Sequence, residues 1–206
     1  MKLAVFDFDS TLVDAETLEI LGEVYGVGEE AKSSTMQAME GKSDFYESLI
    51  SRVALLKGMD FGVAKAVCED LPLHKGAQEV VQGLQRRGYK VVCFSGGFKL
   101  ATAFFKDKLG LDADFSNTLH TREGVLEGRV SGPMMRGDSK FELLSSLQQL
   151  LGVRHTIVVG DGANDVCMFG LADVSIAFNA KEIVRQKASI VAQSLDLREI
   201  LEYVKS

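Results

Sequence analysis

The stretch Leu3-Ala4-Val5-Phe6-Asp7-Phe8-Asp9-Ser10-Thr11 joins a short apolar run to two acidic residues. The apolar run predicts a buried strand, and alternation along it places Asp7 and Asp9 on the same side where the strand ends. Two neighbouring carboxylates repel each other unless a metal ion or a reacting group offsets their charge. Ligands of open α/β sheets bind beyond the carboxyl ends of the strands. The stretch therefore predicts a candidate nucleophile, a candidate acid and a candidate metal site.

Beyond this stretch the chain alternates strand-like runs with helical patterns. The predicted strands are residues 3–6, 90–94, 156–159 and 174–178, with a weaker one at 189–191. The predicted helices are residues 77–87, 98–109 and a helix that opens at Ser139-Lys140-Phe141-Glu142, which resembles a capping box. β-type residues around Glu123-Gly124 predict a hairpin at the sheet edge. The alternation predicts an α/β fold with a Rossmann-like parallel sheet.

Residues 15–72 break this alternation. They contain no good strand pattern and four helical ones, at 17–25, 29–39, 45–56 and 62–71. The segment starts directly after the acidic stretch, and Pro72 marks its exit. We predict a small helical domain, here called the cap segment (residues 15–72), inserted after the first strand of an α/β core that comprises residues 1–14 and 73–206.

Composition narrows the class of protein. The 206 residues are 46% apolar and 25% charged, which is ordinary globular composition. The net charge is -6 with scattered cations, which argues against nucleic acid or an anionic membrane as a partner. There is no signal-peptide pattern, no run of membrane-spanning length and no CxxC motif, and the three cysteines predict buried thiols in a reducing cytoplasm. The oligomeric state stays open.

Three further strand ends carry polar groups. Ser95-Gly96-Gly97 offers a hydroxyl and backbone N–H groups that could approach an anion at the next helix. Lys140 opposes the helix dipole in its first turn, which indicates a task such as neutralising a phosphoryl oxygen. Asp161-Gly162-Ala163-Asn164-Asp165 has the hard oxygen ligands that suit Mg²⁺. Each could be an ordinary turn or a solvated lysine, but together they supply what phosphoryl transfer requires.

The order and spacing of these motifs resemble the four motifs of the haloacid dehalogenase superfamily. Other stretches resemble the members of that superfamily that hydrolyse O-phospho-L-serine: Asp14-Ala15-Glu16, Met39-Glu40-Gly41-Lys42, Arg52-Val53-Ala54-Leu55-Leu56-Lys57 and Asp196-Leu197-Arg198-Glu199-Ile200-Leu201. The resemblance covers nearly the whole chain. It implies a Mg²⁺-dependent hydrolase that releases L-serine and phosphate through an aspartyl-phosphate, the last step of serine biosynthesis.

The resemblance also implies roles for individual residues. Asp7 would be the nucleophile and Asp9 the acid/base, with Ser95 and Lys140 completing the catalytic set. Mg²⁺ would be held by the Asp7 carboxylate, the Asp9 carbonyl oxygen and Asp161, with Asp165 and Asn164 in support. The predicted substrate-binding residues are Glu16, Met39, Phe45, Arg52, Ser95, Gly96, Gly97 and Asn164.

Two charged residues of the cap segment fit an amino-acid substrate. Arg52 falls on one helical stripe with the apolar residues Phe45, Leu49, Val53 and Leu56, and a guanidinium on such a face is costly unless an anion meets it. The substrate carboxylate could be gripped bidentately there, and Glu16 could meet the substrate ammonium. The alternatives are an ordinary first-turn acid and an arginine that extends to water. Met39 and Phe45 would exclude water, or simply pack in a core.

Three other functions remain open at this stage. The same chemistry could serve another small phosphomonoester, for example with homoserine as phosphoryl acceptor. A receiver-type signalling domain also uses acids, a hydroxyl and a lysine at a sheet edge, although it is shorter and would have no use for Asp9 or for an inserted segment. The third is an inactive Mg²⁺-binding scaffold. The presence of every group that the reaction needs argues against it.

Overall fold

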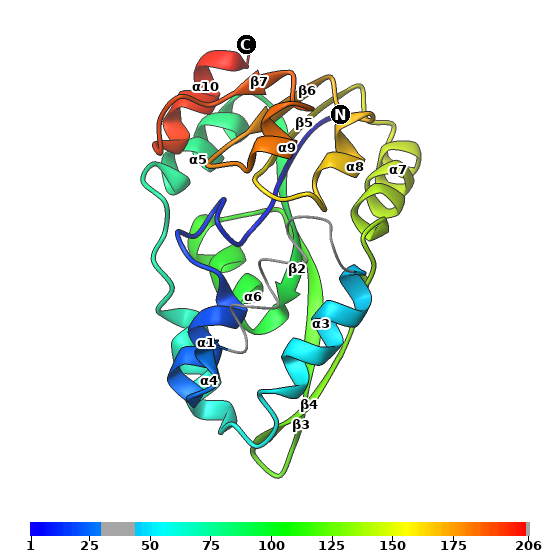
Figure 1. The fold of residues 1–206 in the computed structure, drawn as a ribbon. Coiled ribbons are helices and arrows are strands. Elements are labelled where there is room, and N and C mark those ends of the chain that lie inside the picture. Colours follow the sequence, from blue (N-terminus) through cyan, green and yellow to red (C-terminus); the bar gives the residue numbers. More distant parts are fainter. Residues whose placement is uncertain (30–43, 205–206) are drawn as a thin grey trace.

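The computed structural model describes residues 1–29 and 44–204, and within them seven strands form one sheet (Figure 1). Their order is β4-β3-β2-β1-β5-β6-β7, and all neighbours are parallel except β3 and β4. The strands are β1 (Lys2–Phe6), β2 (Tyr89–Phe98), β3 (Ala113–Arg122), β4 (Val125–Ser131), β5 (His155–Gly160), β6 (Val174–Ala177) and β7 (Ile190–Val191). The predicted α/β fold with a largely parallel sheet is confirmed.

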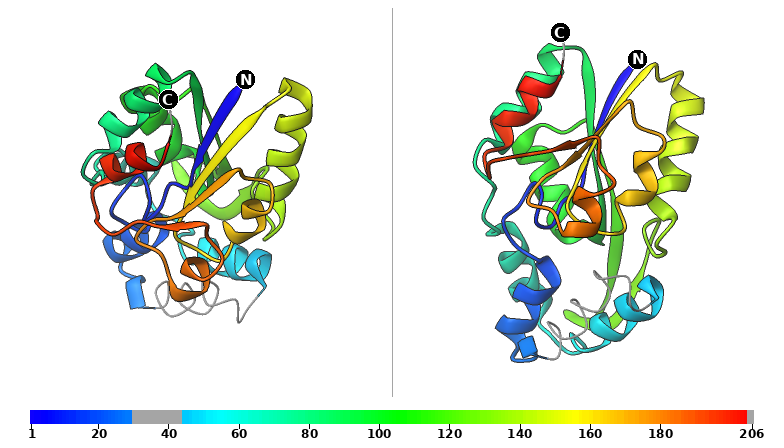
Figure 2. Two further views of the ribbon diagram at one scale, coloured as in Figure 1. Left: turned by 90° about the horizontal axis from the view of Figure 1, so that it is seen from above. Right: turned by 45° about the horizontal axis from the view of Figure 1, so that its top comes forward.

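Helices cover both faces of the sheet (Figure 2). They are α5 (Ala77–Arg86), α6 (Lys99–Leu109), α7 (Ser139–Leu151), α8 (Val166–Phe169), α9 (Glu182–Arg185), η1 (Leu197–Glu199) and α10 (Ile200–Tyr203). Alternate residues of β1 enter different cores: Ala4 and Phe6 pack in the cluster that includes residues of α5 and α6, while Leu3 and Val5 pack in the cluster that includes residues of α7 and α8. The central strand is thus buried on both sides, as its continuous apolar run predicts.

The cap segment contributes the helices α1 (Thr17–Tyr25), α3 (Phe45–Ala54) and α4 (Phe61–Glu69). They follow β1 in the chain and lie at the lower end of the molecule in Figure 1. The two chain segments that link the cap segment to the core run side by side. Asp14 N donates to Pro72 O, and His74 N donates to Leu12 O. A helical insertion after the first strand is therefore present. The predicted helix at 29–39 falls almost entirely outside the described residues.

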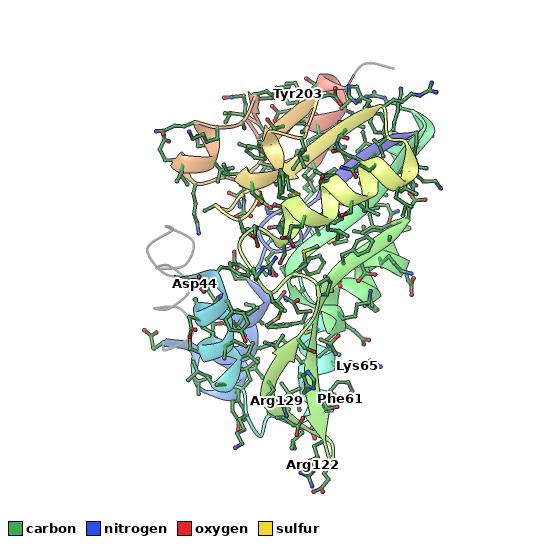
Figure 3. All side chains as sticks on the ribbon, turned by 90° about the vertical axis from the view of Figure 1, so that its right-hand side faces the viewer. Asp44, Phe61, Lys65, Arg122, Arg129 and Tyr203 are labelled. Atoms are coloured by element: carbon green, nitrogen blue, oxygen red, sulfur yellow. The ribbon has the colours of Figure 1, made fainter. Side chains whose placement is uncertain are left out.

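The β3–β4 hairpin does more than close the sheet edge. Leu126 N donates to Met59 O, and Phe61 N donates to Gly124 O, so backbone hydrogen bonds join the far end of the hairpin to the cap segment. In Figure 3, Phe61 lies beside the hairpin and Arg122 lies at its tip. The predicted edge hairpin is confirmed, but its support of the cap segment depends on contacts between residues distant in the sequence.

The capping-box prediction for α7 is wrong. The residue before the helix is Asp138, whose side chain makes no capping hydrogen bond. Instead, Ser139 Oγ accepts from Arg136 N at 3.0 Å, and Glu142 binds the Arg136 side chain. Ser139 Oγ thus stabilises the turn that leads into α7. It does not cap a free N–H group in the first turn of the helix.

The expectations from composition hold in part. Cys68 and Cys93 are buried free thiols, whereas Cys167, also free, is only half-buried. No helix in the described ranges is both long and apolar enough to cross a membrane.

A glycine in β4 lets the hairpin approach α3 closely, which predicts an effect on stability. Gly128 has φ +69°, and a Cβ there would lie 2.9 Å from Lys57 Cβ and 3.1 Å from Ala54 O. Gly128→Ala should add a steric clash of about 1–3 kcal/mol to a left-handed backbone cost of about 1–2 kcal/mol. Urea unfolding followed by circular dichroism measures the loss.

The matched control is Gly124→Ala in the same hairpin. Gly124 has φ +81°, and a Cβ on it would meet no neighbouring atom within 4 Å, so only the backbone cost of about 1–2 kcal/mol applies. Equal losses in the two variants would contradict the inferred close packing of β4 on α3.

Candidate active site

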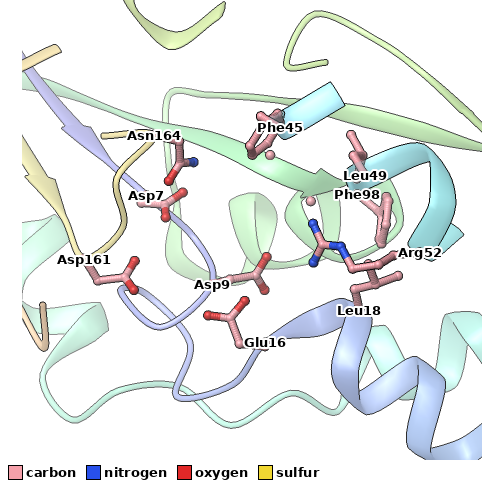
Figure 4. Close-up of a pocket in the computed structure, with 12 residues that line it drawn as sticks. Asp7, Asp9, Glu16, Leu18, Phe45, Leu49, Arg52, Phe98, Asp161 and Asn164 are labelled. Carbon is pink, nitrogen blue, oxygen red and sulfur yellow. The ribbon is translucent and has the colours of Figure 1, made fainter. Parts of the chain in front are cut away.

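A cavity lies where β1 and β2 end, between the sheet and the cap segment (Figure 4). Its lining residues are Asp7, Asp9, Glu16, Leu18, Phe45, Leu49, Arg52, Gly96, Gly97, Phe98, Asp161 and Asn164. In Figure 4, Asp7, Asp161 and Asn164 lie on one side and Arg52 on the other, with Asp9 and Glu16 between them. The chain thus brings acids of the core and charged residues of the cap segment to one cavity.

Lys140 lies beneath this cavity and joins two acids. Its Nζ is 2.7 Å from Asp7 Oδ1 and 2.7 Å from Asp165 Oδ1. Asp7 continues the alternation of Leu3 and Val5 and therefore points to the side of the sheet that α7 covers. The lysine side chain is only 3% exposed, so the solvated alternative is excluded. Its unfavourable place in the helix dipole is offset by these two ion pairs.

Asp7, Asp161 and Asp165 form a buried acidic triad. Their carboxylate oxygens lie within 4.8 Å of one another. Burial raises the pKa of Asp7 and that of Asp161, and raises the pKa of Asp165 to about 6, while Lys140 opposes these shifts. Burial alone would lower the pKa of Lys140, but Asp165 and Asp7 raise it above its ordinary value. One ammonium does not balance three carboxylates, and oxygen donors in this number suit a hard divalent cation.

Asp165 also fixes the turn that carries Asp161. Its Oδ2 accepts hydrogen bonds from Asp161 N and from Gly162 N, each at 3.1 Å. Both of its oxygens are thus engaged, one by Lys140 and one by the turn. Asp165 is fully buried and does not line the cavity, which leaves Asp161 and Asn164 as the residues of this loop that face it.

Asp9 is held by the start of the cap segment. Its Oδ1 accepts from Thr17 N at 2.9 Å and from Thr17 Oγ1. Burial raises the pKa of Asp9, and the hydrogen bonds from Thr17 oppose that rise. A Cβ at Gly97 would lie 2.8 Å from Asp9 Oδ2, so the glycine is what allows the carboxylate to sit over β2.

The strand that carries the Ser-Gly-Gly motif is longer than predicted. The strand expected to end at residue 94 continues to Phe98, with irregular pairing between Phe94 and Phe98. Gly97 N donates to Ser95 Oγ at 2.9 Å, and both glycines of the motif line the cavity. Ser95 is buried behind the cavity, and Gly96 leaves room for the ring of Phe45, which a Cβ would meet at 2.8 Å.

The cap segment supplies one acidic side chain, Glu16, and one basic side chain, Arg52, to the cavity. Glu16 Oε1 accepts from Ser10 Oγ at 2.7 Å, and burial, with the charge of Asp9, raises the pKa of Glu16 to about 8. Arg52 is 9% exposed, so it does not extend to water, and its Nε donates to Ser48 O at 3.1 Å. Both side chains line the same cavity, so the cap segment brings one acidic and one basic group to it.

The structure does not describe one predicted residue, and some residues that line the cavity were not predicted. Met39 falls outside the described residues. The sequence did not single out Leu18, Leu49 and Phe98 as site residues, nor Thr17 behind Asp9. Leu49 shares a helical stripe with Phe45 and Arg52, which is a signal that could have placed it here. The other missed residues carry no such pattern.

Comparison with known proteins identifies the class. The family model for haloacid dehalogenase-like hydrolases matches residues 1–173, and the chain belongs to this family of hydrolases. Within it, the chain is 57% identical over 206 residues to the phosphoserine phosphatase of Wolinella succinogenes, covering 99% of this chain and 100% of that protein. It is 44% identical to the phosphoserine phosphatase of Methanocaldococcus jannaschii, covering 99% and 98%.

Solved structures of phosphoserine phosphatases have the same fold as this chain. A phospho-aspartyl intermediate analogue of phosphoserine phosphatase superposes with a TM-score of 0.95 at 44% identity, covering 99% of each chain. A substrate-bound phosphoserine phosphatase complex has a TM-score of 0.95 at 43% identity, covering 99% of this chain and 98% of that one. The whole described fold, cap segment included, is thus that of known phosphoserine phosphatases.

The buried lysine predicts a large effect on stability. Lys140→Met keeps the length of the side chain but leaves Asp7, Asp161 and Asp165 without their cation, and breaking a buried ion pair costs about 3–5 kcal/mol. The loss at pH 7 should shrink near pH 5. Since burial already raises the pKa of Asp165 to about 6 with the lysine present, its carboxyl takes up a proton there and no longer needs a partner. Urea unfolding at both values of pH, in EDTA, measures the change.

Lys99→Met is the matched control for this variant. Lys99 Nζ is 2.8 Å from Asp114 Oδ1, but its side chain is 47% exposed, so the pair contributes about 0–1 kcal/mol. A Lys140→Met loss no greater than that of Lys99→Met would contradict the charge balance inferred for the triad.

Proposed function

We propose that this protein hydrolyses O-phospho-L-serine to L-serine and phosphate through an aspartyl-phosphate on Asp7. One observation carries the proposal: a single cavity holds Asp7 on one side and the opposite charges of Glu16 and Arg52 toward the other. A phosphate ester of a zwitterionic amino acid matches that distribution of charge. The family and the two relatives named above support the same reaction.

In the first half-reaction an oxygen of Asp7 attacks phosphorus. A carboxylate is already nucleophilic when ionised, and the ammonium of Lys140 favours that form of Asp7 against the effect of burial. The bond between phosphorus and the serine oxygen breaks as the bond to Asp7 forms. Asp9, whose pKa is raised by burial, gives its proton to the departing serine oxygen.

In the second half-reaction water replaces Asp7 on phosphorus. The Asp9 carboxylate takes a proton from that water as its oxygen attacks the phosphoryl group. The bond between phosphorus and Asp7 then breaks, which releases phosphate and restores the free carboxylate. Asp9 is thereby protonated again for the next substrate.

We propose Mg²⁺ as the resident cation. The fit rests on the chemistry of the donor set: three buried carboxylates within 4.8 Å exceed the charge of one lysine and offer hard oxygen ligands. Asp7, Asp161 and the carbonyl oxygen of Asp9 would hold it, with Asp165 and Asn164 in support. When bound, the cation offsets negative charge on the phosphoryl oxygens and on the acids around them.

Recognition of the amino-acid head falls to the cap segment, which we propose as a separate domain of residues 15–72. Arg52 would bind the substrate carboxylate, and Glu16 the ammonium. Since burial raises the pKa of Glu16 to about 8, a bound ammonium would favour its charged form. Free cysteines throughout the chain fit a reducing cytoplasm.

The alternative functions do not receive equal support. The receiver-type domain and the inactive scaffold receive no support, since the chain belongs to a hydrolase family and its cap segment contributes to the cavity. Another small phosphomonoester, or transfer to an acceptor such as homoserine, uses the same residues and is separated by a substrate panel.

The first test is phosphate release from O-phospho-L-serine. We expect turnover that depends on Mg²⁺ and falls by at least about 10⁴-fold in Asp7→Asn, because the amide cannot form the covalent intermediate. Malachite-green detection of phosphate, with and without EDTA, measures this.

The control for that substitution is Asp114→Asn, another buried carboxyl that lies outside the cavity. It should keep wild-type turnover. Persistent turnover by Asp7→Asn would exclude the aspartyl-phosphate route.

The second test concerns the substrate head. Wild type should prefer O-phospho-L-serine to O-phosphoethanolamine, which lacks the carboxylate. In Arg52→Leu the ratio of the two kcat/KM values should fall by about 10- to 100-fold, because a charge-assisted pair to the carboxylate is lost. The exposed Arg129→Leu should leave the ratio unchanged. An unchanged ratio in Arg52→Leu would remove the arginine from substrate recognition.

A further inference from the structure

The carboxylate of Asp9 is bonded asymmetrically. Thr17 N and Thr17 Oγ1 both donate to one of its oxygens, Oδ1, the first at 2.9 Å. Thr17 is the first residue of α1 and is 1% exposed, so bulk water does not compete for its hydroxyl. One oxygen of Asp9 is therefore occupied by the cap segment before any substrate binds.

The other oxygen of Asp9 lies toward the cavity. Oδ2 sits 2.8 Å from the position that a Cβ on Gly97 would take, and Gly97 lines the cavity with Asp9. In Figure 4 the Asp9 carboxylate stands between the Asp7 side and the Arg52 side of this space. Its two oxygens thus have different surroundings, one bonded by Thr17 and one beside Gly97 at the cavity wall.

The same helix start also holds Glu16. Ser10 Oγ donates to Glu16 Oε1 at 2.7 Å, and Ser10 N donates to Ala15 O at 3.0 Å. Two consecutive residues of the core loop, Asp9 and Ser10, are therefore bonded to the entry of α1. The position of this helix sets both the orientation of Asp9 and the place of the acid that faces the substrate ammonium.

We propose that Thr17 is a positioning residue for the reaction, which holds Oδ1 of Asp9 so that Oδ2 exchanges the proton. The inference rests on the proposed function. In the first half-reaction the proton on Oδ2 passes to the serine oxygen as its bond to phosphorus breaks and the bond to Asp7 forms. In the second half-reaction Oδ2 takes a proton from the attacking water as the bond to Asp7 breaks. Thr17 keeps its own proton throughout.

The test is Thr17→Val, which keeps the shape and the backbone N–H group but removes the hydroxyl. Steady-state turnover of O-phospho-L-serine with Mg²⁺ should show kcat lowered about tenfold, because proton transfer from a misaligned carboxyl is slower. KM should stay within about twofold, because Glu16 and Arg52 are untouched. In single turnovers, both serine release and phosphate release should slow.

Two comparisons separate positioning from simple loss of structure. Thr17→Ser retains a hydroxyl and should recover at least half of wild-type kcat. Thr102→Val is the matched control: its buried hydroxyl also donates to a carboxylate, Asp114 Oδ2 at 2.6 Å, but lies outside the cavity, so kcat should not change. Thermal unfolding checks that each variant is folded, and Thr17→Ala replaces Thr17→Val if the valine variant is not.

The outcomes are distinct. An unchanged kcat in Thr17→Val, a loss confined to KM, or a Thr17→Ser variant as slow as Thr17→Val would overturn the role of Thr17 while leaving the proposed function intact. A wild-type protein without turnover of O-phospho-L-serine would instead overturn the proposed function and this inference with it.

Discussion

Burial of one lysine among three acids is the constraint on which the site depends. Lys140, from α7, reaches Asp7 after β1 and Asp165 after β5, so it ties two strand ends together beneath the cavity. A single cation leaves the triad with excess negative charge. Hard oxygen donors with excess negative charge suit a divalent cation. The same ion pairs favour the ionised form of Asp7 and fix its position, so the charge balance bears on both the stability and the electrostatics of the site.

The second constraint is that the cap segment and the core share their functional residues. Asp9 belongs to the core loop but is bonded to Thr17, and Glu16 belongs to the cap segment but is bonded to Ser10. The β3–β4 hairpin pairs with the other end of the cap segment through Leu126. The cap segment is thus attached to the core beside Asp9 and at the hairpin, as well as through its linkers. Its attachment beside Asp9 connects Glu16 of the cap segment with Asp9 of the core through hydrogen bonds on neighbouring residues.

Prediction from the sequence succeeded where the signal is local. Continuous apolar runs placed β1, β2, β5 and β6, and acids at strand ends located one side of the cavity, because parallel strands end at a common edge. Prediction failed where a side chain could form a hydrogen bond with more than one backbone group, or where a strand continued beyond its apolar run. Ser139 bonds the preceding turn instead of capping α7, and β2 runs on to Phe98 beyond the predicted strand end. Local patterns do not reveal which of two possible partners a hydroxyl takes.

The sequence by itself determined the α/β alternation, the inserted helical segment and the identity of the acids and the lysine, because strand periodicity and motif order are written in neighbouring residues. Only the tertiary structure decided which groups meet. It seats Lys140 between Asp7 and Asp165, 133 and 25 residues away along the chain, and turns Thr17 onto one oxygen of Asp9. Such contacts follow from the packing of whole elements, since a side chain finds its partner only after the helices and strands that carry both have been placed.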